Sequence, residues 1–197
     1  MADNIFVYLG GEQVVPEDVT HVRIDRSVKI IPREAFEGRR ELLSVETHDD
    51  LEKIEEYAFN CCTSLRGIKL PGVRIVELLA FYNCYALSDV EFGDKLETIG
   101  EGVFGACRSL QKIKMPSVRD IGSHAFNGCQ QLADVELPCV GTMGPGAFTG
   151  CPRLCRIAIP LKDNLFLDDY RQRYTQFDNC ENLATVDLVE VEGIRKT

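Results

Sequence analysis

An internal repeat of about 22 residues is the feature that most limits what this chain can fold into. Phenylalanine recurs along the chain at steps of 23, 22, 23, 22, 22 and 29 residues. A leucine follows each of these phenylalanines six residues later, and a β-branched residue comes three residues after that leucine. A unit this short cannot bury its own apolar side, so the spacing predicts coils that stack and share one core. The phenylalanines are Phe36, Phe59, Phe81, Phe104, Phe126, Phe148 and Phe177.

Each unit combines a strand pattern with a return pattern. The β-branched residue, a polar residue and a further apolar residue alternate with the period of a strand, and proline ends four of these strands. We expect the strands of successive coils to lie parallel, about 4.8 Å apart. The return pattern, Ile-x-x-x-Ala-Phe-x-x-Cys, predicts a short helical turn or loop. Gly100 and Gly122 follow the isoleucine of this pattern, which favours corners with unusual φ.

The consensus I-x-x-x-A-F-x-x-C-x-x-L-x-x-[IV]-x-L-P resembles the BspA-like leucine-rich repeats over about residues 14–190. The resemblance implies an α/β repeat fold, a right-handed leucine-rich-repeat solenoid. In that fold a parallel β-sheet lines the concave face, and short helical turns or loops line the convex face. Members of this family are repeat scaffolds, found on some microbial surfaces and in intracellular families of protists and algae. The resemblance therefore implies macromolecular recognition without identifying a partner.

We expect one domain over residues 1–197, built in four parts. Residues 1–30 form an N-terminal cap, with a β-hairpin that turns at Gly10–Gly11 and a partial repeat at Val19–Ile24. Residues 31–160 hold the regular repeats, and 178–197 hold the last repeat and the C-terminal end. Residues 161–177 are an insert with helical spacing of apolar residues. This insert has two interpretations, a longer return segment that covers the last coil or a projection that contacts a partner.

Charge and composition argue against several classes of function. The formal net charge of −9 does not favour a phosphate-binding surface, so we expect no nucleic-acid partner. No apolar run approaches the roughly 18–20 residues needed to span a bilayer, and the first residues do not resemble a signal peptide. We therefore expect a cytoplasmic protein that does not insert into membranes.

The cysteines and histidines do not form a recognisable chemical site. One cysteine recurs per repeat, which makes a row of thiols instead of four ligands that converge on a metal, so packing in the core is expected. His21, His48 and His124 occupy different positions of the repeat, which disfavours a Cys–His site. No catalytic residue, metal or cofactor is predicted. The recurring cysteines are Cys62, Cys84, Cys107, Cys129, Cys151 and Cys180.

The outward positions of the predicted strands carry charges whose sign alternates from one repeat to the next. One interpretation is a ladder that neutralises itself and avoids like-charge repulsion between neighbouring strands. The other is a mixed-charge strip that recognises a protein, and the two can coexist. We name this candidate protein-binding surface the charged strip. It consists of Glu46, Lys69, Asp89, Glu91, Lys112, Lys114, Asp134, Glu136 and Arg156.

The sequence therefore predicts a non-enzymatic protein-binding scaffold that uses the sheet face, with the insert as a further contact. A secreted or cell-surface adhesin is the alternative, and it would be expected to have oxidised cysteines. An enzyme with an unrecognised site would need a deep pocket with converging polar groups, which the repeat pattern does not indicate.

Overall fold

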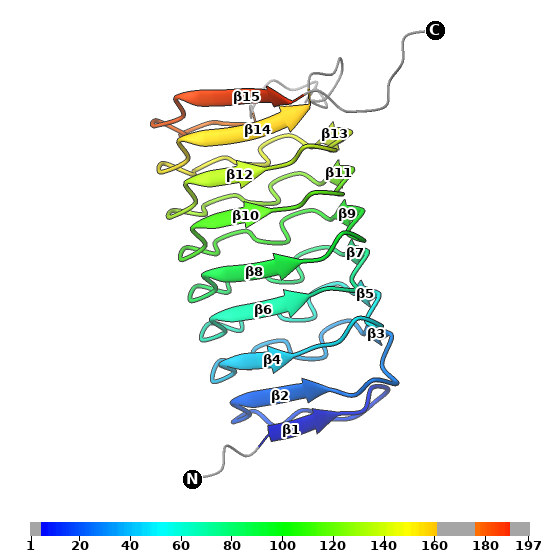
Figure 1. Cartoon of the computed structure of the whole chain (residues 1–197). Coiled ribbons are helices and arrows are strands. Elements are labelled where there is room, and N and C mark those ends of the chain that lie inside the picture. The colour runs from blue at the N-terminus through cyan, green and yellow to red at the C-terminus, as the bar shows by residue number, and fades with distance from the viewer. Residues whose placement is uncertain (1–4, 161–175, 190–197) are drawn as a thin grey trace, which may run out of the picture.

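The chain folds into a stack of turns in which each complete turn has three sides (Figure 1). The computed structural model describes residues 5–160 and 176–189. One side of a turn is a longer strand, the second is a two-residue strand, and the third is a segment of tight turns around the Ala-Phe pair. The expected stack of parallel-stranded coils is confirmed.

The longer strands form a parallel sheet, the long-strand sheet. Its β-branched residues lie opposite one another in adjacent strands, for example Val45 with Ile68 and Ile68 with Val90, and they point into the core. The alternation in the sequence therefore produces a sheet with one buried and one exposed face. The strands are β1 (Ile5–Tyr8), β2 (His21–Ile24), β4 (Ser44–Glu46), β6 (Gly67–Leu70), β8 (Asp89–Phe92), β10 (Lys112–Lys114), β12 (Asp134–Glu136), β14 (Arg156–Pro160) and β15 (Thr185–Val189).

The ladder of the long-strand sheet has one interruption. Its hydrogen-bonded orders are β1-β2-β4-β6-β8 and β10-β12-β14-β15, so β8 and β10 lie side by side without a ladder between them. Phe92, at the end of β8, occupies a position that is leucine or methionine in the neighbouring turns, and its ring packs edge-on against Phe104 at 6.2 Å. The other two sides of the stack remain bonded across this level.

The two-residue strands form the second sheet, the short-strand sheet, which continues without interruption along the stack. Its pairs are parallel, and the second residue of every strand is buried in the common core. The strands are β3 (Ile30–Ile31), β5 (Lys53–Ile54), β7 (Ile75–Val76), β9 (Thr98–Ile99), β11 (Asp120–Ile121) and β13 (Thr142–Met143).

Of the two structures expected on the third side, helical turns or loops, only the second is found: the side consists of tight turns, and the described residues contain no helix. In each of the six turns from Phe36 to Phe148, the residues two before and two after the phenylalanine have left-handed backbone conformations. Around Phe59, for example, Tyr57 has φ 57° and Cys61 has φ 60°. A right-handed helix cannot pass through two such residues four positions apart, since left-handed residues interrupt its bonding pattern.

The left-handed residues redirect the backbone hydrogen bonds from within a turn to the next turn. Phe36 N–H donates to the carbonyl of Ala58 at 2.8 Å, and Phe104 N–H donates to Ala125 at 2.7 Å. The residues two before and two after the five phenylalanines from Phe36 to Phe126 donate in the same direction, as Gly38 does to Asn60. Successive turns are therefore joined by backbone hydrogen bonds on all three sides, except that the bonds of the long-strand sheet are interrupted between β8 and β10. A non-glycine residue in the left-handed conformation costs about 1–2 kcal/mol.

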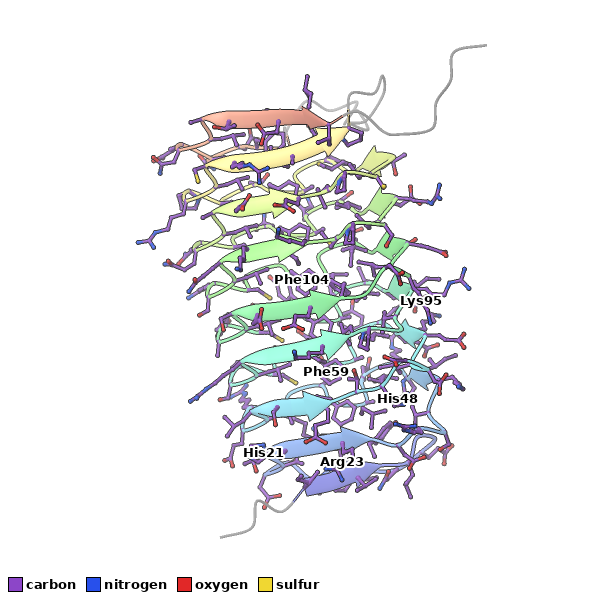
Figure 2. All side chains as sticks on the ribbon, in the orientation of Figure 1. His21, Arg23, His48, Phe59, Lys95 and Phe104 are labelled. Atoms are coloured by element: carbon purple, nitrogen blue, oxygen red, sulfur yellow. The ribbon has the colours of Figure 1, made fainter. Side chains whose placement is uncertain are left out.

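A column of phenylalanine rings runs through the core (Figure 2 labels Phe59 and Phe104). Neighbouring rings are nearly parallel, with centroids 5.1 Å apart for Phe59 and Phe81 and 5.4 Å apart for Phe104 and Phe126. Phe177 continues the column at 5.8 Å from Phe148, so the last described turn keeps the register despite the longer spacing in sequence. The rings supply much of the apolar area that stacking removes from water.

The recurring cysteines belong to the core, as the sequence predicts. Each thiol lies near the phenylalanine carbonyl of the preceding turn and donates to it, as Cys84 Sγ does to Phe59 at 3.2 Å. None of the nine cysteines forms a disulfide, and all nine lie in the described ranges. Burial raises the pKa of Cys62 to about 12 and also raises the pKa of Cys84 and Cys107, so these thiols stay protonated.

The N-terminal end differs from the expected hairpin. β1 pairs in parallel with β2, and residues 12–15 form no strand. The side chain of Gln13 instead accepts from Leu9 N–H and donates to the carbonyl of Val7, so it occupies the open edge of β1. Tyr8 contacts the ring of Phe36 and ends the aromatic column. Arg39 donates to the carbonyls of Val15 and Glu37, which joins the first full turn to this segment.

Gly100 and Gly122 also differ from their expected role, because neither has a positive φ. Glycine is needed there for close packing: a Cβ on Gly122 would lie 2.5 Å from the backbone nitrogen of Glu101 in the preceding turn. The expected helical insert over 161–177 falls outside the described residues except for its last two positions, so it stays a prediction.

Replacing one ring of the aromatic column should destabilise the whole stack. Phe104→Ala is expected to lower the free energy of unfolding by about 3–5 kcal/mol, because the fully buried ring packs against rings in both neighbouring turns. Urea unfolding followed by circular dichroism measures this. The control is Tyr85→Ala, which removes a ring that is 38% exposed and should cost less than about 1 kcal/mol. Equal costs for the two variants would contradict the shared aromatic core.

The buried thiols should make the stability of the domain sensitive to alkaline pH. In the folded chain their raised pKa keeps them protonated, whereas the unfolded chain loses these protons near its ordinary cysteine pKa of about 8.5. The unfolded state then binds fewer protons, so the free energy of unfolding falls as pH rises above that value. Urea midpoints between pH 8 and 10, measured with a reductant, should show this. Cys107→Ala should flatten the decline by up to about 1.4 kcal/mol per pH unit. If the free energy of unfolding fell equally steeply with pH in Cys107→Ala and in the unmodified chain, the buried thiol of Cys107 would not be the cause of the decline.

Candidate protein-binding face

All nine residues of the charged strip lie on the outward face of the long-strand sheet, on strands β4, β6, β8, β10, β12 and β14. The six in β4 to β10 are exposed, and Asp134, Glu136 and Arg156 are half-buried. The parallel register places Lys69 opposite Glu91 and Lys114 opposite Glu136. The sequence therefore located these side chains on one continuous face, and their part in recognition stays a prediction.

Most charges of the strip form ion pairs between neighbouring strands. Lys69 Nζ lies 2.8 Å from Glu91 Oε2, and Lys114 Nζ lies 2.9 Å from Glu136 Oε2. The hydrogen bond to Glu91 raises the pKa of Lys69, which remains a cation at neutral pH. Each of these two lysines contacts one carboxylate. Exposed pairs of this kind contribute little to stability, under about 1 kcal/mol each.

Arg156 is the most connected charge on the face. Its guanidinium contacts Asp134 at 2.8 Å, Asp187 at 2.7 Å and Glu136 at 3.4 Å. Hydrogen bonds to Asp134 and Asp187 raise its pKa further above its ordinary value. A planar guanidinium that joins three strands fixes its carboxylates more firmly than an isolated pair does. The end of the strip near β14 is therefore the more rigid end.

Asp89 and Lys112 are the strip residues without an ion pair to any described residue. Both are exposed, and they lie on β8 and β10, the two strands that lack a ladder between them. Their charges remain available at the level where the sheet is interrupted.

The face includes two charged residues that the strip omitted. Arg23 on β2 contacts Glu46 at 2.7 Å, and Asp187 on β15 contacts Arg156 (Figure 2 labels Arg23). Arg23 follows Val22 just as Glu46 follows Val45, and this spacing was the signal that could have identified it. It was missed because the first strand lacks the Ala-Phe half of a repeat.

A polar groove of about 480 Å³ lies along the corner between the two sheets, where Figure 2 labels Lys95. The corners that contain Asp49 and Asp94 are one residue longer than the Gly72 corner between them, so Gly72 forms the recess. A Cβ on Gly72 would lie 2.1 Å from the Asp49 carbonyl, which excludes larger residues. The groove is open, and its lining mixes both signs: Asp49, Asp50, Glu52, Gly72, Arg74, Asp94, Lys95, Glu97, Ser117 and Arg119.

His21 and His48 form hydrogen bonds away from the thiols. His21 Nδ1 is 2.7 Å from Ser44 Oγ on the outward sheet face, and His48 Nε2 is 2.9 Å from the carbonyl of Asp25. Within the described ranges, no three side chains of histidine, cysteine, aspartate or glutamate are grouped to hold a metal ion. The same ranges contain no helix long and apolar enough to cross a bilayer.

Comparison with known proteins matches the repeat to a family. The pattern described as the BspA type Leucine rich repeat region matches in six copies, over residues 16–117 and 74–196. A crystal structure of a leucine-rich repeat protein from T. pallidum, TpLRR, is 30% identical with a TM-score of 0.69, and the match covers 91% of this chain and 82% of that one. No curated protein matches.

Two further solved structures share the fold at lower identity. A leucine-rich repeat protein from Bacteroides ovatus is 20% identical, with a TM-score of 0.53 and coverage of 87% of this chain and 55% of that chain. The pneumococcal vaccine antigen PcpA is 14% identical, with a TM-score of 0.51 and coverage of 95% and 56%. This chain thus spans about half of each of these two proteins. From the repeat matches and the likeness to TpLRR, the chain belongs to the BspA-type leucine-rich repeat family.

Proposed function

We propose that this chain is a non-enzymatic protein-binding scaffold whose contact surface is the outward face of the long-strand sheet. One observation carries the proposal: charged side chains stand exposed on strands whose backbones are fixed by hydrogen bonds to their neighbours. A rigid frame loses little entropy when it binds, so its fixed charges can favour one partner over others. Membership of a repeat-scaffold family supports the same function.

The pattern of charge favours a protein partner with its own alternating charges. Cations and carboxylates alternate along the strip, and most of them already pair with each other. A polyanion such as nucleic acid would meet a carboxylate beside nearly every cation, so this face does not suit binding to a phosphate backbone. The insert at 161–177 is a second candidate contact, and it is proposed from the sequence alone.

Reversing an ion pair while keeping it paired tests the contact surface. The double variant Lys69→Glu with Glu91→Lys should fold normally but lose at least tenfold in partner capture, because the partner meets reversed charges in an unchanged frame. Affinity capture from the native source, with quantitative mass spectrometry, measures the loss. Thermal unfolding checks that stability is kept.

The matched control is Arg74→Glu with Glu97→Arg, which reverses an ion pair of similar exposure at the corner groove. It should leave capture unchanged. Unchanged capture by the sheet-face variant would remove this face from consideration. A loss confined to the control would assign binding to the groove instead.

A secreted or cell-surface recognition protein is the alternative, favoured by the fold shared with a pneumococcal vaccine antigen. Cysteine oxidation discriminates between the two settings, because disulfides persist in oxidising compartments. We propose the cytoplasmic setting and expect about nine titratable thiols per chain in protein taken from its native source and denatured under thiol-free conditions. The exposed Cys139 and Cys155 would oxidise first at a cell surface, so recovery of about seven or fewer thiols would favour the alternative.

A further inference from the structure

The outward sheet face has a hollow of about 370 Å³ centred on Gly67. Gly67 opens strand β6, at the position that in other turns bears a side chain, such as Ser44 in β4 and Asp89 in β8. No side chain fills the space above Gly67, so the face is recessed where its neighbours project. We name this recess the Gly67 hollow.

The floor and the rim of the hollow differ in chemistry. Gly67 lines the floor together with the backbone of Val45 and Ile68, whose side chains point into the core, and these backbone groups are already used in the sheet. Glu46, Lys69 and Asp89 carry the charges around it. The hydroxyl of Thr47, which also lines the hollow, donates to the carbonyl of Lys69. The floor at Gly67 therefore has no polar side chain, and the charges lie on the residues around it.

The charged residues around the hollow differ in whether they already form an ion pair. Glu46 is paired with Arg23, and Lys69 is paired with Glu91, which lies outside the lining. Asp89 is exposed and has no ion pair with any described residue. Asp89 is therefore the one carboxylate lining the hollow that has no ion pair among the described residues, although the cation of Lys69 lies near enough to attract it.

We propose that the Gly67 hollow receives a basic side chain, foremost arginine, from the protein partner. The aliphatic stem lies over the floor at Gly67 and the guanidinium binds Asp89. This inference rests on the proposed function and names the chemistry that the partner presents. Arginine and lysine combine an apolar stem with a charged end, and a guanidinium matches a carboxylate with two parallel hydrogen bonds. An acidic side chain would meet Asp89 and Glu46, whereas an apolar side chain would leave Asp89 without a counter-ion.

The hollow can be filled without disturbing the fold. Gly67 has no positive φ, and a Cβ built on it lies 3.4 Å from the Asp89 carbonyl oxygen and 3.7 Å from the Asp89 Cβ, which are ordinary contacts. Gly67→Leu should therefore fold and also gain strand propensity. Thr185→Leu is its matched control, because Thr185 occupies the same repeat position on β15, away from the hollow.

The test uses small probes and nuclear magnetic resonance on the isotope-labelled full chain. N-acetyl-arginine-N-methylamide should shift the amide signals of Gly67, Lys69 and Asp89 saturably in the millimolar range. The citrulline analogue, which has similar shape without charge, should bind at least fivefold more weakly. Gly67→Leu and Asp89→Asn should each abolish the preference for arginine, while Thr185→Leu and Asp94→Asn should retain it.

Three outcomes overturn the inference: no saturable shift at these amides, equal binding of arginine and citrulline, or unchanged arginine binding in Gly67→Leu. None of them affects the proposed function, which the ion-pair reversal of Lys69 and Glu91 tests through partner capture. Conversely, arginine binding at the hollow with unchanged capture by the reversed pair would support the hollow and count against the wider charged strip.

Discussion

The backbone hydrogen bonds that link each turn to the next on the third side are the constraint on which the structure depends. They require left-handed residues on both sides of the six phenylalanines from Phe36 to Phe148, even where the residue is tyrosine, leucine or alanine. These conformations persist because each turn is fixed by its neighbours, and the hydrogen bonds and packing gained between turns offset their cost. A single turn in isolation would have neither compensation.

The same bonds set the register of the core. Because the N–H of each phenylalanine is tied to the carbonyl next to the following phenylalanine, the rings are brought to centroid separations of 4.9–5.8 Å and stack. The cysteine column completes this arrangement, since each thiol donates to a phenylalanine carbonyl one turn earlier. Cysteine here combines a small apolar volume with a weak hydrogen-bond donor. These two properties explain why cysteine recurs at a regular spacing along the chain without any metal or redox chemistry.

Because these hydrogen bonds and the core fix the backbone, the outward side chains of the long-strand sheet can differ from turn to turn. The long-strand sheet holds its outward side chains at the spacing of the strands, so each change of residue alters the surface without altering the fold. The ion pairs of the charged strip and the Gly67 hollow are both products of this freedom. The first comes from opposite charges placed in register, and the second comes from a missing side chain in one turn.

The sequence by itself determined the periodic features: the repeat, the parallel strands, the buried phenylalanines, leucines and cysteines, and the outward position of the charged strip. These follow from the spacing of apolar residues, since one period repeated seven times leaves few alternatives. Tertiary structure alone decided the rest. The third side is not helical, β1 joins the sheet in parallel, and Lys69 pairs with Glu91 while Asp89 stays unpaired. Each of these depends on which hydrogen bonds and charges a neighbouring turn supplies, and a local pattern does not contain that information.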